Sequence, residues 1–460
     1  MATLPQDFLF GTATASYQVE GAVTEGGRGR SVWDDFCDRP GAIRDGSSGT
    51  VACDHYHRYA DDIALMKELG ADAYRFSIAW PRIQPDGTGP ANAEGLAFYD
   101  RLVDGLLEAG ITPAATLFHW DLPSALEAGG GWLVRETALR FAEYAAIVAG
   151  HLGDRVRMWM PVNEPVIVTL LGYATGVHAP GRTLMLDAMP VAHHLLLGHG
   201  LAVQALRAAG AGSVGCAHNH TPVWPGSDDP ADRGAADVYD VLHNRLFADP
   251  VLLGSYPSGM ADGMPGPVAE DLAIISAPLD FFGFNYYRPT RVGAVDGPAA
   301  RAAGGAGPAD LELSGLPALP FAMLPIEGYP RTGFGWPVVP EGLHEQLLIL
   351  RDRYGDRLPP VFVTENGCAH AGGPGPDGKV HDPERITYLE SHLDAVARAR
   401  EDGVDVRGYF CWSLLDNFEW AEGYTQRFGL VHVDYDTLRR TPKDSFAWFA
   451  QRIRETHRGG

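Results

Sequence analysis

Residues 54–79, DHYHRYADDIALMKELGADAYRFSIA, contain the unit from which the fold is assembled. Apolar residues at helical spacing predict an amphipathic helix over residues 54–69. Asp54 is expected to cap the start of this helix, and Gly70 is expected to end it. The next segment, AYRFSIA (73–79), alternates and then becomes apolar, which predicts a strand. The unit is therefore a helix, a glycine stop and a short strand.

The same unit recurs along the chain. Helical patterns that lead into further apolar segments cover residues 92–109, 136–150, 190–209, 341–354 and 383–401, and a last helix is expected over residues 444–455. The predicted strands are residues 8–14, 73–79, 112–118, 156–162, 213–219, 280–286, 360–366 and 407–413. Eight strands that alternate with helices indicate a parallel sheet, either doubly wound or closed into a barrel.

Polar or aromatic side chains stand at or just after the ends of nearly all these strands. They are Gln18, Arg75, His119, Trp120, Asn163, Glu164, Asn219, Asn285, Tyr287, Glu365 and Trp412. An open sheet gathers its ligands at one switch point, whereas a barrel collects them from all its strands around one mouth. We therefore predict an α/β fold of one (β/α)₈ TIM barrel, with elaborated loops at the C-terminal face of the strands. Residues 291–335 are expected to form a long loop at that face.

Charge and cysteine content exclude several kinds of partner. The chain has 36 Lys and Arg against 58 Asp and Glu, a formal net charge of −22. Such a surface repels phosphate backbones and anionic lipid, so neither nucleic acid nor membrane is expected as a partner. The 5 cysteines contain no CxxC pair, which argues against a disulfide framework or a zinc site. With no signal-peptide pattern and no long apolar run, we predict a cytoplasmic protein.

Two carboxylates stand out by their context. Glu164 follows the fourth strand in MPVNEP, and Glu365 ends the seventh strand in VFVTENG. In a barrel these two positions face each other across the mouth. Paired carboxylates there suit cleavage of a glycosidic bond, because one protonates the leaving oxygen while the other attacks or activates water. A single Glu is more often a surface acid, but the flanking motifs and the matched strand ends favour the catalytic interpretation.

Side chains suited to a sugar surround these acids. Hydrogen-bonding groups for hydroxyls are Gln18, His119, Asn163 and Glu419, and flat apolar faces for a pyranose ring are Trp120, Trp412 and Trp420. One tryptophan alone is more often part of a core. Three of them beside polar strand ends favour a sugar site.

With these residues identified, the sequence resembles glycoside hydrolase family 1, the β-glucosidase family, over essentially its whole length. The matching motifs are FLFGTATASYQVEG (8–21), YRFSIAWPRIQPDG (74–87), LFHWDLP (117–123), VNEP (162–165), GFNYY (283–287), VTENG (363–367) and WSLLDNFEWAEGYTQRFGLVHVDY (412–435). The resemblance implies that Glu164 is the general acid/base and Glu365 the nucleophile of a retaining enzyme. Residues 1–460 are then one catalytic domain that needs no cofactor and no metal.

The resemblance also implies which residues hold the substrate. Gln18, His119, Asn163, Tyr287, Trp412, Glu419 and Trp420 match positions that bind the glycone, Trp336 matches an aglycone position, and Trp120 and Asn285 complete the predicted set. Arg75, together with Tyr287, is expected to orient Glu365 and to keep it ionised. Val166 stands where the family often has an aromatic residue, which leaves the leaving-group preference open.

The activity implied is that of a retaining exo-β-glycosidase acting on terminal non-reducing β-D-glucosyl residues, with side activity on β-galactosides or β-fucosides. The expected substrates are small β-glucosides or cello-oligosaccharides, and the sequence does not predict an oligomeric state. Glu419 stands where the family holds the sugar's 4- and 6-hydroxyls, so 6-phosphorylated sugars are expected to be poor substrates.

Two other interpretations fit the sequence less well. A catalytically inactive carbohydrate-binding barrel predicts the loss of one carboxylate, yet Glu164 and Glu365 are both present. A metal-dependent sugar isomerase or hydrolase needs a ligand set, and His218 and His220 beside Asn219 are the nearest approach to one. The hydrolase without a metal is the preferred hypothesis.

Overall fold

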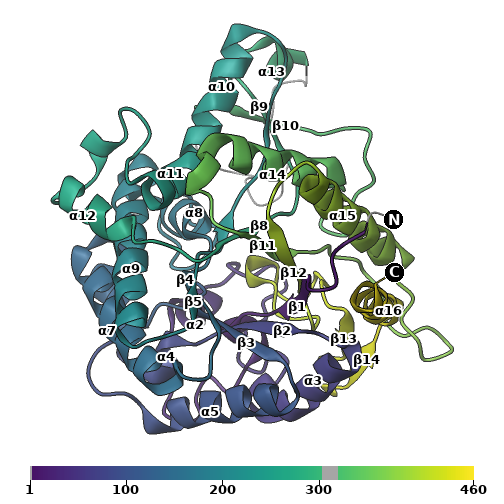
Figure 1. Ribbon diagram of the computed structural model, residues 1–460. Helices are drawn as coiled ribbons and strands as arrows, with labels where there is room; N and C mark the ends of the chain where they lie inside the picture. Colours follow the sequence, from purple (N-terminus) through teal and green to yellow (C-terminus); the bar gives the residue numbers. More distant parts are fainter. Residues whose placement is uncertain (1–2, 303–319, 460) are drawn as a thin grey trace.

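All eight predicted strands are present in the computed structural model, which describes residues 3–302 and 320–459. The barrel strands are β1 Leu9–Ala13, β2 Ala73–Ser77, β3 Thr112–Phe118, β4 Met158–Val162, β5 Ser213–Val214, β6 His218–Asn219, β8 Phe282–Asn285, β11 Val361–Asn366 and β12 Val406–Trp412. They pair in the order β5-β4-β3-β2-β1-β12-β11-β8-β6, and every pairing between them is parallel. The predicted α/β barrel is confirmed (Figure 1).

The fifth predicted strand, residues 213–219, is split into β5 and β6. Bridges from Asn163 to Ala217 and from Gly215 to Phe281 connect this broken strand to its neighbours on both sides, so the sheet closes on itself. Gly283 on β8 has no room for a side chain here, because a Cβ would lie 2.2 Å from the carbonyl oxygen of Cys216.

A ring of helices surrounds the strands (Figure 1). They are α3 His55–Leu69, α5 Ala93–Glu108, α7 Arg135–Leu152, α9 Met189–Ala208, α14 Pro340–Tyr354, α15 Pro383–Glu401 and α16 Asp444–Arg458, each close to its predicted range. Gly70 ends α3 with a left-handed φ of 78°, as predicted. Asp54 occupies the N-cap position, as predicted, but its side chain does not cap the helix: its carboxylate accepts hydrogen bonds from His57 and Arg58 instead of from the helix backbone.

The connection between β6 and β8, residues 220–281, contains several helices that the sequence pattern did not predict. We call it the excursion. Its elements are β7 Val223–Pro225, α10 Pro230–Asp240, the π-helical turn η4 Val241–Arg245, α11 Leu246–Leu253, the 3₁₀ turn η5 Ala261–Gly263 and α12 Val268–Ile275. From within the excursion, β7 pairs with β9 Thr290–Gly293, and β9 also pairs with β10 Ala322–Leu324. Tyr239 of α10 packs with Val292 and Met323 in a small core that fixes α10 on this sheet.

The segment predicted as a long loop, residues 291–335, contains most of β9, all of β10 and the short helix α13 Pro298–Ala302. Its residues 303–319 lie outside the described residues. The same sheet and α13 form the projection at the top of Figure 1, together with α10.

Short elements complete the remaining loops. They are α1 Ser16–Val19, α2 Val32–Cys37, α4 Trp80–Ile83, α6 Ser124–Ala128, η1 Gly131–Leu133, α8 Pro165–Ile167, the π-helical η2 Val168–Ala174, η3 Met185–Ala188, η7 Gly355–Arg357, η8 Trp420–Glu422, and the hairpin β13 Val431–Val433 with β14 Arg440–Pro442. The loop after β12 is tied to the end of this hairpin, because the ammonium group of the buried Lys443 lies 2.7 Å from Asp416.

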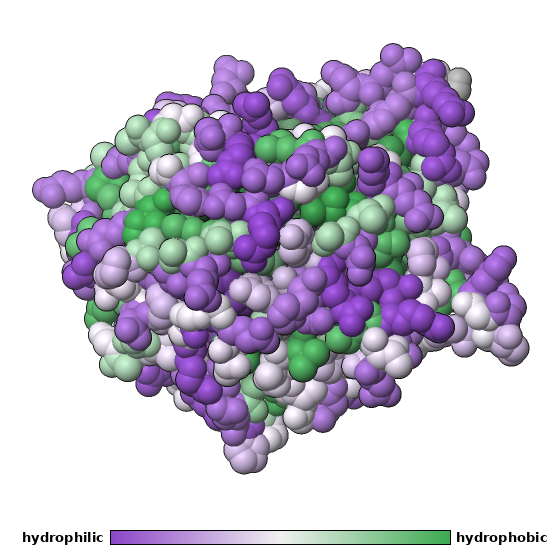
Figure 2. Space-filling model, turned by 90° about the horizontal axis from the view of Figure 1, so that it is seen from below, coloured by the Kyte–Doolittle hydropathy of each residue, from purple (hydrophilic) through white to green (hydrophobic). Residues whose placement is uncertain are grey.

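The surface is predominantly hydrophilic on the face shown in Figure 2, where hydrophobic residues form small separate groups. The large hydrophobic cluster lies inside, between the barrel strands and the helices. Across the described part of the chain, none of the helices combines the length and apolar character required to cross a membrane.

Candidate active site

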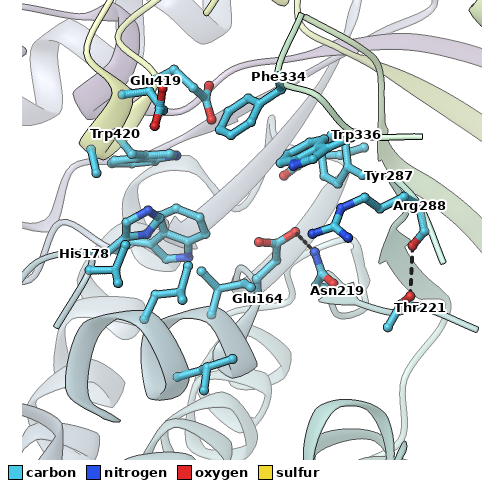
Figure 3. A pocket seen from close by; sticks show the side chains of 18 of the residues that line it. Glu164, His178, Asn219, Thr221, Tyr287, Arg288, Phe334, Trp336, Glu419 and Trp420 are labelled. Carbon is cyan, nitrogen blue, oxygen red and sulfur yellow. Dashed lines mark hydrogen bonds between the residues drawn. The ribbon is translucent and has the colours of Figure 1, made fainter. Parts of the chain in front are cut away.

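A cavity of about 470 Å³ opens at the carboxyl ends of the strands. Nine predicted site residues line it: His119, Trp120, Glu164, Tyr287, Trp336, Glu365, Trp412, Glu419 and Trp420. In Figure 3, Glu419 and Trp420 lie on one side of this cavity and Tyr287 and Trp336 on the other, with Glu164 below. The barrel thus gathers into one space side chains that are up to three hundred residues apart in the sequence.

The other four predicted residues, Gln18, Arg75, Asn163 and Asn285, are buried directly behind the cavity wall. Each of them contacts a residue that lines the cavity. Gln18 donates to Glu419, Arg75 to Glu365 and Asn285 to Glu164, while the Asn163 amide nitrogen lies 3.0 Å from His119 Nε2. The thirteen predicted side chains therefore form one connected group.

Glu365 is the next-to-last residue of β11 and is only 3% exposed. The Arg75 guanidinium on β2 binds its Oε1, and the Tyr287 hydroxyl donates to its Oε2 at 2.7 Å. Burial raises the pKa of Glu365 above its usual range, and Arg75 and Tyr287, which favour the ionised form, reduce that rise. Both oxygens are thus held by donors, which fixes the orientation of this carboxylate.

Glu164 follows β4 in a left-handed conformation, with φ of 45°, and is 4% exposed. Asn285 and Asn219 donate to its Oε1 at 2.7 and 3.0 Å. Burial first, and then the charge of Glu365, raises the pKa of Glu164 to about 8. At neutral pH this carboxyl group therefore holds its proton. Because Oε1 already accepts two N–H groups, the proton belongs on Oε2.

A hydrogen-bonded hub connects the two acids. Asn163 Oδ1 accepts from Arg75 at 2.6 Å and from Asn285 at 3.1 Å. Arg75 and Asn285 in turn hold Glu365 and Glu164. The relative orientation of the two carboxyl groups is therefore fixed by buried side chains before any substrate binds.

Aromatic rings form two walls of the cavity. Trp120 and Trp420 lie with ring centroids 4.5 Å apart, and both have left-handed backbones, with φ of 78° and 48°. On the opposite side Trp336 stacks on Phe334 at 4.3 Å and meets Tyr287 edge-on at 5.5 Å. Such faces suit the C–H surfaces of sugar rings. Backbone strain of this kind gathers at functional sites, and Glu164 shares it.

Unpaired polar atoms lie at the Glu419 end. Among the described residues, Gln18 Oε1 and His119 Nδ1 are buried without a hydrogen-bond partner. Burial holds the pKa of His119 well below its usual range, so the ring is neutral. Since Nε2 accepts from Asn163, the remaining hydrogen is on Nδ1. Unpaired buried donors and acceptors are costly, and a ligand rich in hydroxyls would satisfy them.

Sequence reasoning missed several residues that line the cavity. The most prominent are His178, His243, Arg288, Phe334 and Phe428. Arg288 directly follows the motif GFNYY, and Phe428 lies inside the motif 412–435, so both were within reach of the motif comparison. His243 lies in the unpredicted excursion, where no local pattern marked it.

His218 and His220 face each other with ring centroids 6.0 Å apart, and Phe282 packs against both rings. Burial holds the pKa of each well below its usual range. Within residues 3–302 and 320–459, no three His, Cys, Asp or Glu side chains are grouped as a metal site. Cys368, near Glu365, is buried, and burial raises the pKa of its thiol to about 12.

A closed parallel barrel with two buried acids at its mouth, one protonated and the other beside an arginine, is the arrangement expected of a glycoside hydrolase. The sequence model described as Glycosyl hydrolase family 1 matches residues 1–458. The chain belongs to this family and is a retaining glycoside hydrolase.

Similar proteins agree with this assignment. The chain is 44% identical to β-glucosidase A of Acetivibrio thermocellus, with 98% of each chain covered. It is 46% identical to a bifunctional β-D-glucosidase/β-D-fucosidase of Bifidobacterium breve, again with 98% of each covered. The crystal structure of a psychrophilic β-glucosidase from Micrococcus antarcticus superimposes with a TM-score of 0.93 at 47% identity, covering 99% of this chain and 98% of that one.

Proposed function

We propose that Glu164 is the general acid/base and Glu365 the nucleophile with which this β-glucosidase removes terminal non-reducing β-D-glucosyl residues. The observation that carries this division of roles is the difference between their surroundings. Glu365 lies against the Arg75 guanidinium, whereas Glu164 is held only by neutral amides and has a pKa of about 8. Two carboxyls with different pKa values supply one proton donor and one nucleophile.

In the first step, Glu365 attacks the anomeric carbon while Glu164 Oε2 gives its proton to the leaving oxygen. The glycosidic C–O bond breaks and an ester bond forms between the sugar and Glu365. In the second step, Glu164 takes a proton from water, and the resulting hydroxide displaces Glu365 from the sugar. The product keeps the β-configuration.

The charge of Glu365 couples the two steps. As an anion, Glu365 raises the pKa of Glu164. Once Glu365 is esterified that charge is gone, so the pKa of Glu164 falls and its carboxylate becomes available as a base. One residue can thus serve as the acid first and as the base afterwards.

The remaining predicted residues would bind and orient the sugar. Polar contacts to the glycone are assigned to Gln18, His119, Asn163, Asn285, Tyr287 and Glu419, and apolar contacts to Trp120, Trp412 and Trp420, with Trp336 on the aglycone side and Arg75 holding the nucleophile. The unpaired atoms of Gln18 and His119 support the glycone assignment. The Bifidobacterium relative supports side activity on β-fucosides.

We also propose that the substrates include cello-oligosaccharides, that residues 1–460 form one catalytic domain, and that residues 291–335 border its active site. Met323 and Phe334, which line the cavity, support the last point. A cytoplasmic location is proposed because the five cysteines are free thiols.

The decisive experiment is trapping with a 2-deoxy-2-fluoro-β-glucoside bearing a good leaving group. Time-dependent inactivation is expected, with one sugar attached to the peptide that contains VTENG and fragmentation that assigns it to Glu365. A label on another residue, or inactivation without a label, would overturn the assignment.

A further inference from the structure

A row of hydrogen-bonded side chains leads from the excursion to Glu164; Tyr239 and His243 are buried, and Asn219 is half-buried. The Tyr239 hydroxyl lies 3.3 Å from His243 Nδ1, and His243 Nε2 lies 3.0 Å from Asn219 Oδ1. Asn219 Nδ2 donates to Glu164 Oε1 at 3.0 Å, the contact drawn in Figure 3. His243 is thus separated from Glu164 by a single amide group.

The direction of these hydrogen bonds is determined. Burial lowers the pKa of His243 to about 4, so its ring is neutral and has one N–H group. Asn219 Oδ1 can only accept, which requires the hydrogen on Nε2 and leaves Nδ1 to accept from Tyr239. Each group therefore donates toward Glu164.

We propose that His243 is a positioning residue for the acid/base step: it holds the Asn219 amide with its nitrogen toward Glu164 and so keeps the catalytic proton on Oε2. This inference rests on the proposed role of Glu164.

Such a residue is needed because the oxygen and nitrogen ends of an amide group have nearly the same shape and can exchange places. Without a donor at Oδ1, the Asn219 side chain can turn over and present its oxygen to Glu164 Oε1. The carboxyl group would then satisfy that oxygen by moving its proton to Oε1, where it faces the two amides instead of the leaving group. Proton transfer to the substrate would be lost even though Glu164 is still protonated.

The second amide at Glu164 is fixed in the same way from the barrel side. Asn285 donates to Oε1, while its own Oδ1 accepts from the Thr364 hydroxyl at 2.7 Å. Thr364 and His243 thus play equivalent parts on the two amides. His243 lies on the π-helical turn η4, a kind of distortion that is often found at functional sites.

The test uses His243→Phe, which keeps the ring that stacks on Tyr239 at 5.3 Å but removes both nitrogens. His243→Gln places an amide N–H near the former Nε2. Values of kcat/KM are measured for aryl β-glucosides of similar size with leaving groups from dinitrophenol to phenol, because only poor leaving groups need protonation.

We expect His243→Phe to lose about tenfold on phenyl glucoside but less than about twofold on dinitrophenyl glucoside. The slope of log kcat/KM against the pKa of the leaving group measures how much the enzyme depends on protonation. His243→Gln is expected to restore the slope of the parent enzyme. The matched control is His392→Phe, another buried histidine stacked on a tyrosine four residues earlier, outside the cavity lining. It should leave the slope unchanged. If His243→Phe does not fold, His243→Leu takes its place.

A pH profile supplies an independent readout. The Asn219 hydrogen bond lowers the pKa of Glu164, as do Asn285 and Arg75, whereas burial and Glu365 raise it. Losing the Asn219 donor should therefore move the alkaline limb of kcat/KM to higher pH in His243→Phe. Asp240 and Arg288, the charged groups that act on the pKa of His243, are unchanged in all variants.

An equal loss on every aryl glucoside would show that His243 contacts the aglycone instead, and would overturn the proposal. So would an unchanged slope, an unmoved alkaline limb, or a His243→Gln variant as steep as His243→Phe. Glu164→Ala is measured in the same series. If its slope is also flat, then the proposed role of Glu164 fails; if it is steep while that of His243→Phe is flat, only the positioning role fails.

Discussion

The two carboxyls that we propose as catalytic are held by different kinds of structure. Glu365 and its partner Arg75 both lie within barrel strands, β11 and β2. Glu164 stands just beyond β4 in a left-handed conformation, and one of its two amides is held by His243 from the excursion. We infer that barrel strands hold the proposed nucleophile, whereas the excursion helps to position the proposed proton donor.

The largest effect is expected at the barrel side of this comparison. Glu365→Gln removes the proposed nucleophile and should lower kcat by on the order of 10⁵-fold for every β-glucoside, whatever its leaving group. Steady-state assays on dinitrophenyl and phenyl glucosides check this. A loss confined to one of the two substrates would mean that Glu365 and Glu164 have exchanged roles.

At the other acid the effect should depend on the substrate. Glu164→Ala is expected to lose about 10³-fold on cellobiose, which needs protonation, and far less in the first step on dinitrophenyl glucoside. Added azide should speed turnover by occupying the vacated space and attacking the glycosyl-enzyme. Equal losses on both substrates without azide rescue would point to a structural role.

The proposed sugar contact of Glu419 can be tested independently of the two acids. Its carboxylate in the cavity wall should repel a phosphate, so 6-phospho-β-glucosides should be turned over at least ~100-fold less efficiently than β-glucosides, about 2.7 kcal/mol. Glu419→Ser should narrow the gap, mainly by losing activity on the unphosphorylated sugar. Comparable kcat/KM values for the two sugars on the parent enzyme would contradict this role.

A smaller effect is expected when the charge beside Glu365 is removed. Arg75→Met should cost about 2 kcal/mol, or about 30-fold in kcat/KM. Arg75 lowers the pKa of both acids, and Glu365 is in direct contact with it. Both limbs of the pH profile should therefore move to higher pH, the acidic limb further because it requires Glu365 to be ionised. An unmoved acidic limb would show that Arg75 does not control the nucleophile.

The last prediction concerns the stability of the two regions and not the activity. Val363 on β11 and Val292 on β9 are both fully buried, one in the barrel and one under the excursion. Val363→Ala should lower the stability of the whole barrel by about 2 kcal/mol, whereas Val292→Ala should mainly speed hydrogen exchange in β9, β10 and α10. Equal protection losses throughout the molecule in both variants would mean that the excursion unfolds together with the barrel.

The barrel strands and the excursion also differ in how far the sequence could predict them. The barrel strands alternate with helices whose apolar spacing and glycine stops are local signals, as Gly70 shows. The acids could be found because Glu164 and Glu365 lie in motifs that directly follow or end such strands. These parts depend on neighbours in the sequence, so a single sequence contains enough information to identify them.

The excursion depends on distant contacts instead. Tyr239 is buried because β9 and β10, which come later in the chain, pack beside α10. The split strand formed by β5 and β6 is held in the barrel by bridges to residues next to β4 and β8. Whether Asp54 caps a helix depended on competition from His57 and Arg58. His243, the partner of Asn219, lies in a π-helical turn that the hydrophobic periodicity of the sequence does not predict.

The burial of Lys443 has a practical consequence for attaching this enzyme to a solid support. The chain has three lysines, and Lys443 is inaccessible against Asp416. Reagents directed at side-chain amines can therefore react only at Lys67 and Lys379, which are exposed and do not line the cavity. Coupling through them should yield immobilised molecules whose active-site mouth is left open to dissolved sugars.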